Sequence, residues 1–143
     1  MKTIFTDIDG VFCPVHESIH GNHQDSVDSI NVNLLWANLL ADLLGDVAIQ
    51  IVIHSSWRYR HSIDEIKKIF PESIQKKIVG TVVDHGRYDG IMSYVELHKI
   101  KEFIVLDDVA DFFPMNWSYL ILCDSEKGLS DINVQKKILD FVT

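Results

Sequence analysis

The sequence predicts an α/β fold in which a central, parallel five-stranded sheet is flanked by helices. Short runs of apolar and β-branched residues recur along the chain, and segments with helical periodicity separate them. Consecutive strands joined through helices pair in parallel by right-handed crossovers. With 143 residues and no visible linker, we expect residues 1–143 to form one domain.

The five expected strands are nearly continuous apolar runs, which is typical of parallel strands buried on both faces. They cover residues 4–6, 47–54, 78–83, 103–106 and 119–123.

Four helices are expected between and after these strands. A capping box from Ser62 to Glu65 opens one of them, Gly45 ends another, and Ser130 is a suitable N-cap for the last. The expected ranges are 31–44, 62–70, 90–100 and 128–143. Residues 11–29 are polar and irregular, so we expect a loop or a small flap there.

Composition limits the possible partners and compartments. Lys and Arg total 13 against 21 Asp and Glu, a net charge of −8, which disfavours broad binding to a phosphate backbone but allows a small basic site. Cys13 and Cys123 lack metal-type spacing, and neither a targeting segment nor a membrane span is visible. We therefore expect a cytoplasmic protein with free thiols and no membrane partner.

Polar side chains follow three of the expected strands, at the edge where open α/β sheets bind ligands. Asp7 and Asp9 follow the first strand and point to one side, so they need a divalent cation, a shared proton or both. Ser55 follows the second strand, and Asp107 and Asp108 end the fourth. Each of these later groups is also consistent with an ordinary turn or helix cap.

The run Asp7-Ile8-Asp9-Gly10 resembles motif I of the haloacid dehalogenase (HAD) superfamily, whose members are mostly Mg²⁺-dependent phosphohydrolases. Ser55 and the pair Asp107-Asp108 occupy the positions of motifs II and IV. The resemblance implies a Rossmann-like domain, and the short insert at 11–29 implies a minimal cap or none. It also implies a phosphatase that forms an aspartyl-phosphate.

The resemblance assigns roles to these residues. Asp7 is the expected nucleophile and Asp9 the general acid and base. Ser55, with Ser56 and Arg58, would bind the phosphate, while Gly10 allows the chain to turn. The implied Mg²⁺ ligands are the side chain of Asp7, the backbone carbonyl of Asp9, and Asp108 with Asp107 beside it.

One position departs from the superfamily, which carries a lysine in motif III. Here Arg87, in an expected loop at 84–89, lies where that cation belongs. Arginine supplies the charge and a forked set of donors, but it is not equivalent to lysine. Lys99 is the competing candidate.

A narrower resemblance is to the small HAD domains found in or near multifunctional RNA-repair proteins, which also keep this arginine. It is carried by Ser55-Ser56-Trp57-Arg58, the Arg87 loop, Leu106-Asp107-Asp108 and Gly128-Leu129-Ser130. It implies a phosphorylated substrate, either a nucleotide or a nucleic-acid end. Trp57 is equally consistent with a half-buried packing residue.

Two other functions compete with the phosphatase. A catalytically weak HAD-fold module could serve a protein partner that the sequence does not identify. His16-Glu17-Ser18-Ile19-His20 matches the HExxH zinc pattern, and His23 could add a ligand. However, Pro14 and Gly21 leave no room for the helix that this zinc motif requires.

Overall fold

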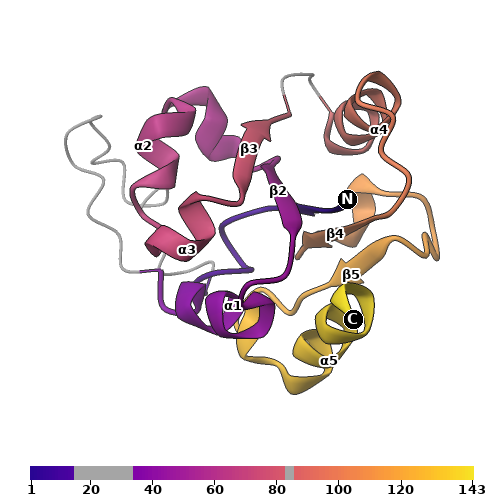
Figure 1. The fold of residues 1–143 in the computed structure, drawn as a ribbon. Helices are drawn as coiled ribbons and strands as arrows, with labels where there is room; N and C mark the ends of the chain where they lie inside the picture. The colour runs from indigo at the N-terminus through magenta and orange to yellow at the C-terminus, as the bar shows by residue number, and fades with distance from the viewer. Residues whose placement is uncertain (15–33, 83–85) are drawn as a thin grey trace.

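Five parallel strands form the centre of the computed structural model, in the order β3-β2-β1-β4-β5 (Figure 1). The structure describes residues 1–14, 34–82 and 86–143. The strands are β1 (Lys2–Thr6), β2 (Ile49–Ile53), β3 (Ile78–Thr81), β4 (Phe103–Asp107) and β5 (Leu120–Leu122). The predicted α/β fold with a five-stranded parallel sheet is thus confirmed.

The register of β1 with its two neighbours determines where the polar strand ends meet. Thr6 pairs with Ile53 of β2 on one side and with Leu106 of β4 on the other. The next residues along these strands, Asp7, His54 and Asp107, therefore come out at the same edge of the sheet. Backbone hydrogen bonds continue this register, from Asp7 N to Leu106 O at 2.9 Å and from His54 N to Thr6 O at 3.0 Å.

Helices cover both faces of the sheet, because alternate strand residues point in opposite directions. The helices are α1 (Ala37–Leu44), α2 (Ile63–Lys67), α3 (Glu72–Gln75), α4 (Arg87–Leu97) and α5 (Ile132–Val142). Ile4 belongs to the core formed with α1, α2, α3 and α5, whereas Phe5 belongs to the core formed with α4. In Figure 1, α4 lies across the sheet from α1 and α5. No helix in the described ranges has both the length and the apolar character needed to span a membrane.

The bounds of several helices differ from the prediction. The chain from 34 to 36 is not helical, because Trp36 N donates to Phe12 O and ties this segment to the turn after β1. The predicted helix at 62–70 keeps its capping box but ends early, and a second short helix, α3, follows Pro71. Asp131, rather than Ser130, is the N-cap of α5, and residues 128–130 form the short 3₁₀ helix η6 (Gly128–Ser130).

The start of α4 is the correction that matters most for function. The sequence predicts that this helix begins at Gly90, after a loop at 84–89. In the structure Gly90 is buried inside the helix, and α4 begins three residues earlier, at Arg87. The predicted loop at 84–89 is therefore wrong from Arg87 onward, and Arg87 projects from the first turn of a helix.

The segment after β1 is more buried than predicted. Val11, Phe12 and Cys13 lie in no helix and no named strand, in agreement with the predicted loop, but they are at most 2% exposed and belong to the main core. The remainder of that prediction, 15–29, lies outside the described residues. The two cysteines are buried and form no disulfide, as the prediction of reduced thiols requires.

Candidate active site

Asp7 lies at the end of the central strand and is almost completely buried, with 3% of its surface exposed. Its Oδ1 accepts the Ile8 N–H at 2.8 Å, and its Oδ2 accepts a hydrogen bond from Arg87 at 2.9 Å. Burial and the nearby charge of Asp107 raise the pKa of the Asp7 carboxyl, while Arg87 opposes this shift. Asp7 therefore requires positive charge nearby to stay ionised.

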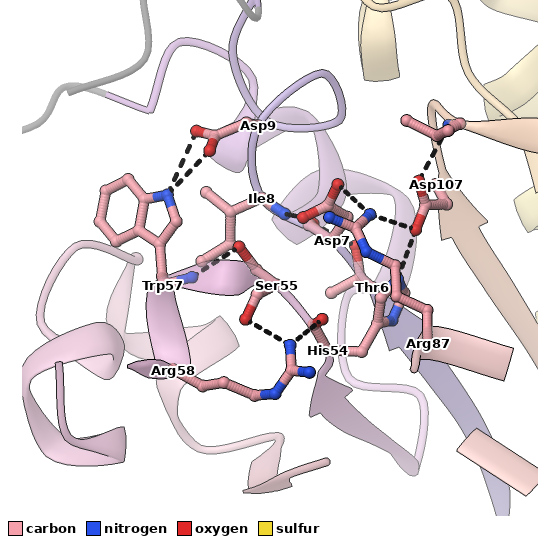
Figure 2. Close-up of polar contacts among 11 residues, drawn as sticks. Thr6, Asp7, Ile8, Asp9, His54, Ser55, Trp57, Arg58, Arg87 and Asp107 are labelled. Atoms are coloured by element: carbon pink, nitrogen blue, oxygen red, sulfur yellow. Dashed lines mark hydrogen bonds and ion pairs between the residues drawn. The ribbon is translucent and has the colours of Figure 1, made fainter. Parts of the chain in front are cut away.

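Arg87 supplies part of that charge by joining two carboxylates. Its Nη1 donates to Asp7 Oδ2 at 2.9 Å and to Asp107 Oδ2 at 2.7 Å (Figure 2). Because these contacts start from the first turn of α4, the helix holds the guanidinium against the end of the sheet. Lys99 lies beyond the other end of α4, on a separate cavity that also includes Lys101 and the strand residue Thr3.

His54 is a site residue that the sequence reasoning missed. It is fully buried, and its Nε2 lies 2.8 Å from Asp107 Oδ2. Asp107 Oδ1 accepts the Val109 N–H at 2.9 Å, so both oxygens of Asp107 already have donors. Although burial raises the pKa of Asp107, His54 and Arg87 outweigh burial and hold the pKa of this carboxyl below its usual value.

Asp108 completes a cluster of three carboxylates. One oxygen from each of Asp7, Asp107 and Asp108 lies within 4.8 Å of the others. Partial burial and the charges of Asp7 and Asp107 raise the pKa of Asp108 to about 7. Closely spaced carboxylate oxygens with excess negative charge are suitable ligands for a hard divalent cation, so the residues present fit Mg²⁺.

Asp9 points away from this cluster. The Trp57 indole N–H lies 3.2 Å from Asp9 Oδ1 and 3.1 Å from Oδ2, so both oxygens share one donor (Figure 2). Trp57 is fully buried, which is more than the half-buried packing residue considered from the sequence. It therefore fixes the position of a carboxylate that remains partly exposed.

The side chains of Ser55 and Arg58 both form hydrogen bonds with backbone groups near them in the sequence. Ser55 is the N-cap of the 3₁₀ helix η4 (Ser56–Tyr59), where its Oγ accepts the Trp57 N–H at 3.2 Å, which confirms the cap interpretation. The hydroxyl still carries a proton that it can donate. The Arg58 guanidinium donates to the backbone carbonyls of His54 and Ser55 (Figure 2).

One predicted residue, Ser56, is not brought to this cluster. Ser56 is partly exposed and lines a neighbouring cavity of about 220 Å³ together with Arg58 and Arg87. The candidate zinc ligands His16, His20 and His23 lie outside the described residues. Gly10 adopts a φ of +80°, which agrees with the sharp turn expected after Asp9.

A parallel α/β sheet with an acidic cluster at the carboxyl end of its central strands defines a HAD-type domain. Residues 3–134 match the family described as the HAD domain in Swiss Army Knife RNA repair proteins, and the chain belongs to this family. The match confirms the resemblance seen in the sequence. Neither a curated protein nor a solved structure shows significant similarity to the chain.

Proposed function

We propose that this protein is a Mg²⁺-dependent phosphomonoesterase that uses Asp7 as its nucleophile. The observation that carries the proposal is the buried Asp7 carboxylate, held by Ile8 N–H and Arg87 beside two further carboxylates. A cation, an arginine and an oriented carboxylate are the groups that phosphoryl transfer requires, because positioning and neutralisation of charge do most of the work.

The reaction proceeds in two displacements. An Asp7 oxygen attacks phosphorus and forms an acyl-phosphate bond, while the ester P–O bond breaks and the leaving oxygen takes a proton from Asp9. Water then attacks the phosphorus, Asp9 accepts the water's proton, and the bond from phosphorus to Asp7 breaks. The hydrogen bonds from Trp57 hold Asp9 away from the cluster, so Asp9 would have to turn toward Asp7 for both proton transfers.

The acidic residues divide into metal ligands and a positioning residue. Asp7 and Asp108, with the backbone carbonyl of Asp9, would hold Mg²⁺. Asp107 instead orients Arg87, since its oxygens already accept from His54, Arg87 and the backbone. When bound, Mg²⁺ supplies positive charge that offsets the repulsion between the carboxylates and the incoming phosphate.

Arg87 takes the part of the superfamily's motif III lysine. It contacts Asp7 directly, so it neutralises the nucleophile in the resting site and stabilises charge on the phosphoryl group during transfer. Ser55, with its free hydroxyl proton, would donate to a phosphate oxygen. The substrate class we favour is a nucleotide or a nucleic-acid end, supported by the description of the family as RNA repair.

The experiment is to measure release of phosphate from p-nitrophenyl phosphate and from 5′- and 3′-phosphorylated oligonucleotides, with Mg²⁺ and with EDTA. Wild-type protein should require Mg²⁺, and Asp7→Asn should abolish turnover while keeping the thermal unfolding temperature. Asp140→Asn, an exposed carboxylate on α5, is the matched control and should behave like wild type. Undiminished turnover by Asp7→Asn would refute the mechanism, and no turnover of any substrate would favour a binding module.

A further inference from the structure

The cavity beside the acidic cluster has an unusual lining. Its volume is about 220 Å³, and it is formed by Ser56, Arg58, Tyr59, Gly86, Arg87 and Phe112. Arg87 is part of both the acidic cluster and the cavity, since its Nη1 contacts Asp7 while its side chain lines the cavity. A group bound in the cavity is therefore adjacent to a phosphate at Asp7.

Two aromatic rings line this cavity and face solvent. Tyr59, in η4, is 63% exposed, and Phe112, in the 3₁₀ helix η5 (Ala110–Phe112), is 47% exposed. Each ring is packed against an arginine: Arg58 Cζ lies 4.4 Å from the Tyr59 ring centroid, and Arg87 Cζ lies 4.6 Å from that of Phe112. Each ring therefore lies against a positively charged group while much of its surface remains open to a ligand.

The charge of the cavity is opposite to that of the whole chain. Among the residues that the structure describes, its lining contains two arginines and no acidic residue, whereas the full sequence carries a net charge of −8. A planar ligand that carries negative charge complements such a surface. Aromatic rings and guanidinium planes are the groups on which proteins stack unpaired bases, and this stacking tolerates every base because each has a π-face.

We propose that this cavity is a nucleobase subsite, in which Tyr59 and Phe112 stack the base of the nucleotide whose phosphate is removed. The proposal rests on the proposed function and specifies its substrate class. The phosphate lies at Asp7 and Arg87, and the base of the same nucleotide lies over the two rings. Arg58 is a positioning residue here, because it donates to the Tyr59 hydroxyl at 2.8 Å and packs on its ring.

The test compares substrates that differ only in the base. We would measure kcat/KM for a single-stranded oligonucleotide with a terminal phosphate, for the same oligonucleotide ending in an abasic nucleotide, and for glycerol phosphate. Stacking on an aromatic side chain predicts that wild type prefers the base-containing end by roughly 5- to 100-fold. Equal rates on the normal and abasic ends would overturn the subsite.

The variants separate ring stacking from other effects. Tyr59→Ala and Phe112→Ala should lose most of the preference for the base, whereas Tyr59→Phe, which keeps the ring, should retain it. Leu97→Ala, at a 77% exposed apolar residue on α4, is the control and should match wild type on all three substrates. A preference that persists in both alanine variants would show that the rings do not carry it.

A binding measurement distinguishes failure of the subsite from failure of the proposed function. Fluorescence anisotropy of labelled normal and abasic oligonucleotides with Asp7→Asn protein requires no turnover. Tighter binding of the normal end without phosphatase activity in wild type would support the subsite and refute hydrolysis. Turnover without any preference for the base would support hydrolysis and refute the subsite. A phosphotyrosine peptide that outcompetes the oligonucleotide would overturn the nucleobase in favour of a protein substrate.

Discussion

Gly10 and Asp108 are packed so closely that no β-carbon fits at position 10. A Cβ built there would overlap with Oδ2 and Cγ of Asp108 and would lie 2.9 Å from its Cβ. Gly10 also has a φ of +80°, where a side chain is strained. The glycine therefore serves two purposes, the turn after Asp9 and the close approach of the Asp108 carboxylate.

We expect Gly10→Ala to lose stabilisation by Mg²⁺, because Asp108 must move away from Asp7. Gly45 provides a matched control, since its φ is +50° and a Cβ there would meet nothing within 4 Å. Both alanine variants should unfold more easily by about 1–2 kcal/mol from backbone strain. Thermal unfolding with and without Mg²⁺ checks this, and an equal Mg²⁺ response in both variants would show that the contact with Asp108 is unimportant.

Removing the Asp107 carboxylate and removing the Asp108 carboxylate should have different effects on the protein. Asp108→Ala should weaken Mg²⁺ binding and leave the metal-free protein as stable as wild type, because it relieves repulsion with Asp7 and Asp107. Asp107→Ala should destabilise the protein by roughly 1–3 kcal/mol, since buried donors of His54 and Arg87 lose their acceptor. Mg²⁺ titration and denaturant unfolding measure the two effects, and the reverse order of Mg²⁺ affinities would exchange the two roles.

Arg87→Ala should lower kcat by roughly 10²–10³, the usual cost of one charge-stabilising contact. It should also destabilise the metal-free protein by roughly 3 kcal/mol, because the buried carboxylates of Asp7 and Asp107 lose their cation. Arg87→Lys should recover part of both, since the charge remains while the fork is lost. Lys99→Ala is the control, and a crippled Lys99→Ala with a nearly normal Arg87→Ala would refute the assignment.

His54 should affect catalysis mainly through Asp107, with which it shares a hydrogen bond. His54→Leu removes the hydrogen bond to Asp107 Oδ2. Asp107, which orients Arg87, is then held less firmly. We expect a lower kcat with little change in Mg²⁺ affinity, because Asp108 and Asp7 are untouched. Steady-state kinetics across Mg²⁺ concentrations checks this, and a large rise in the Mg²⁺ requirement would place His54 nearer to the metal.

The sequence was sufficient for the sheet and for most of the acidic cluster, for a physical reason. Apolar runs that end in carboxylates mark both the strands and the edge at which they end, so Asp7, Asp107 and Asp108 could be grouped before any geometry was known. Arg87 was predicted as the motif III cation, but its place in the first turn of α4 was not, because Gly86 and Gly90 are weak helix formers and favour a loop there.

Other features depend on contacts between residues that are far apart in the sequence, and no local pattern indicates such contacts. His54 looks like the end of an apolar strand, and only the pairing of β2 with β1 brings it to Asp107. The contact of Trp57 with Asp9 joins residues 48 positions apart. Likewise, the cavity that Tyr59 and Phe112 line is formed by the 3₁₀ helices η4 and η5 and by the start of α4, three elements that only the fold brings together.

The central position of β1 in the sheet determines how the protein should unfold. The amides of Asp7 and His54 are bonded across neighbouring strands, and neither β1 nor β2 lies at an edge of the sheet. Amides in such interior strands exchange with solvent only when the whole molecule opens. Their exchange rates should therefore be among the slowest in the chain. On heating, the loss of activity and the loss of the sheet should therefore occur in one cooperative transition. There should be no temperature range in which the fold is intact but the carboxylates of the site have moved apart.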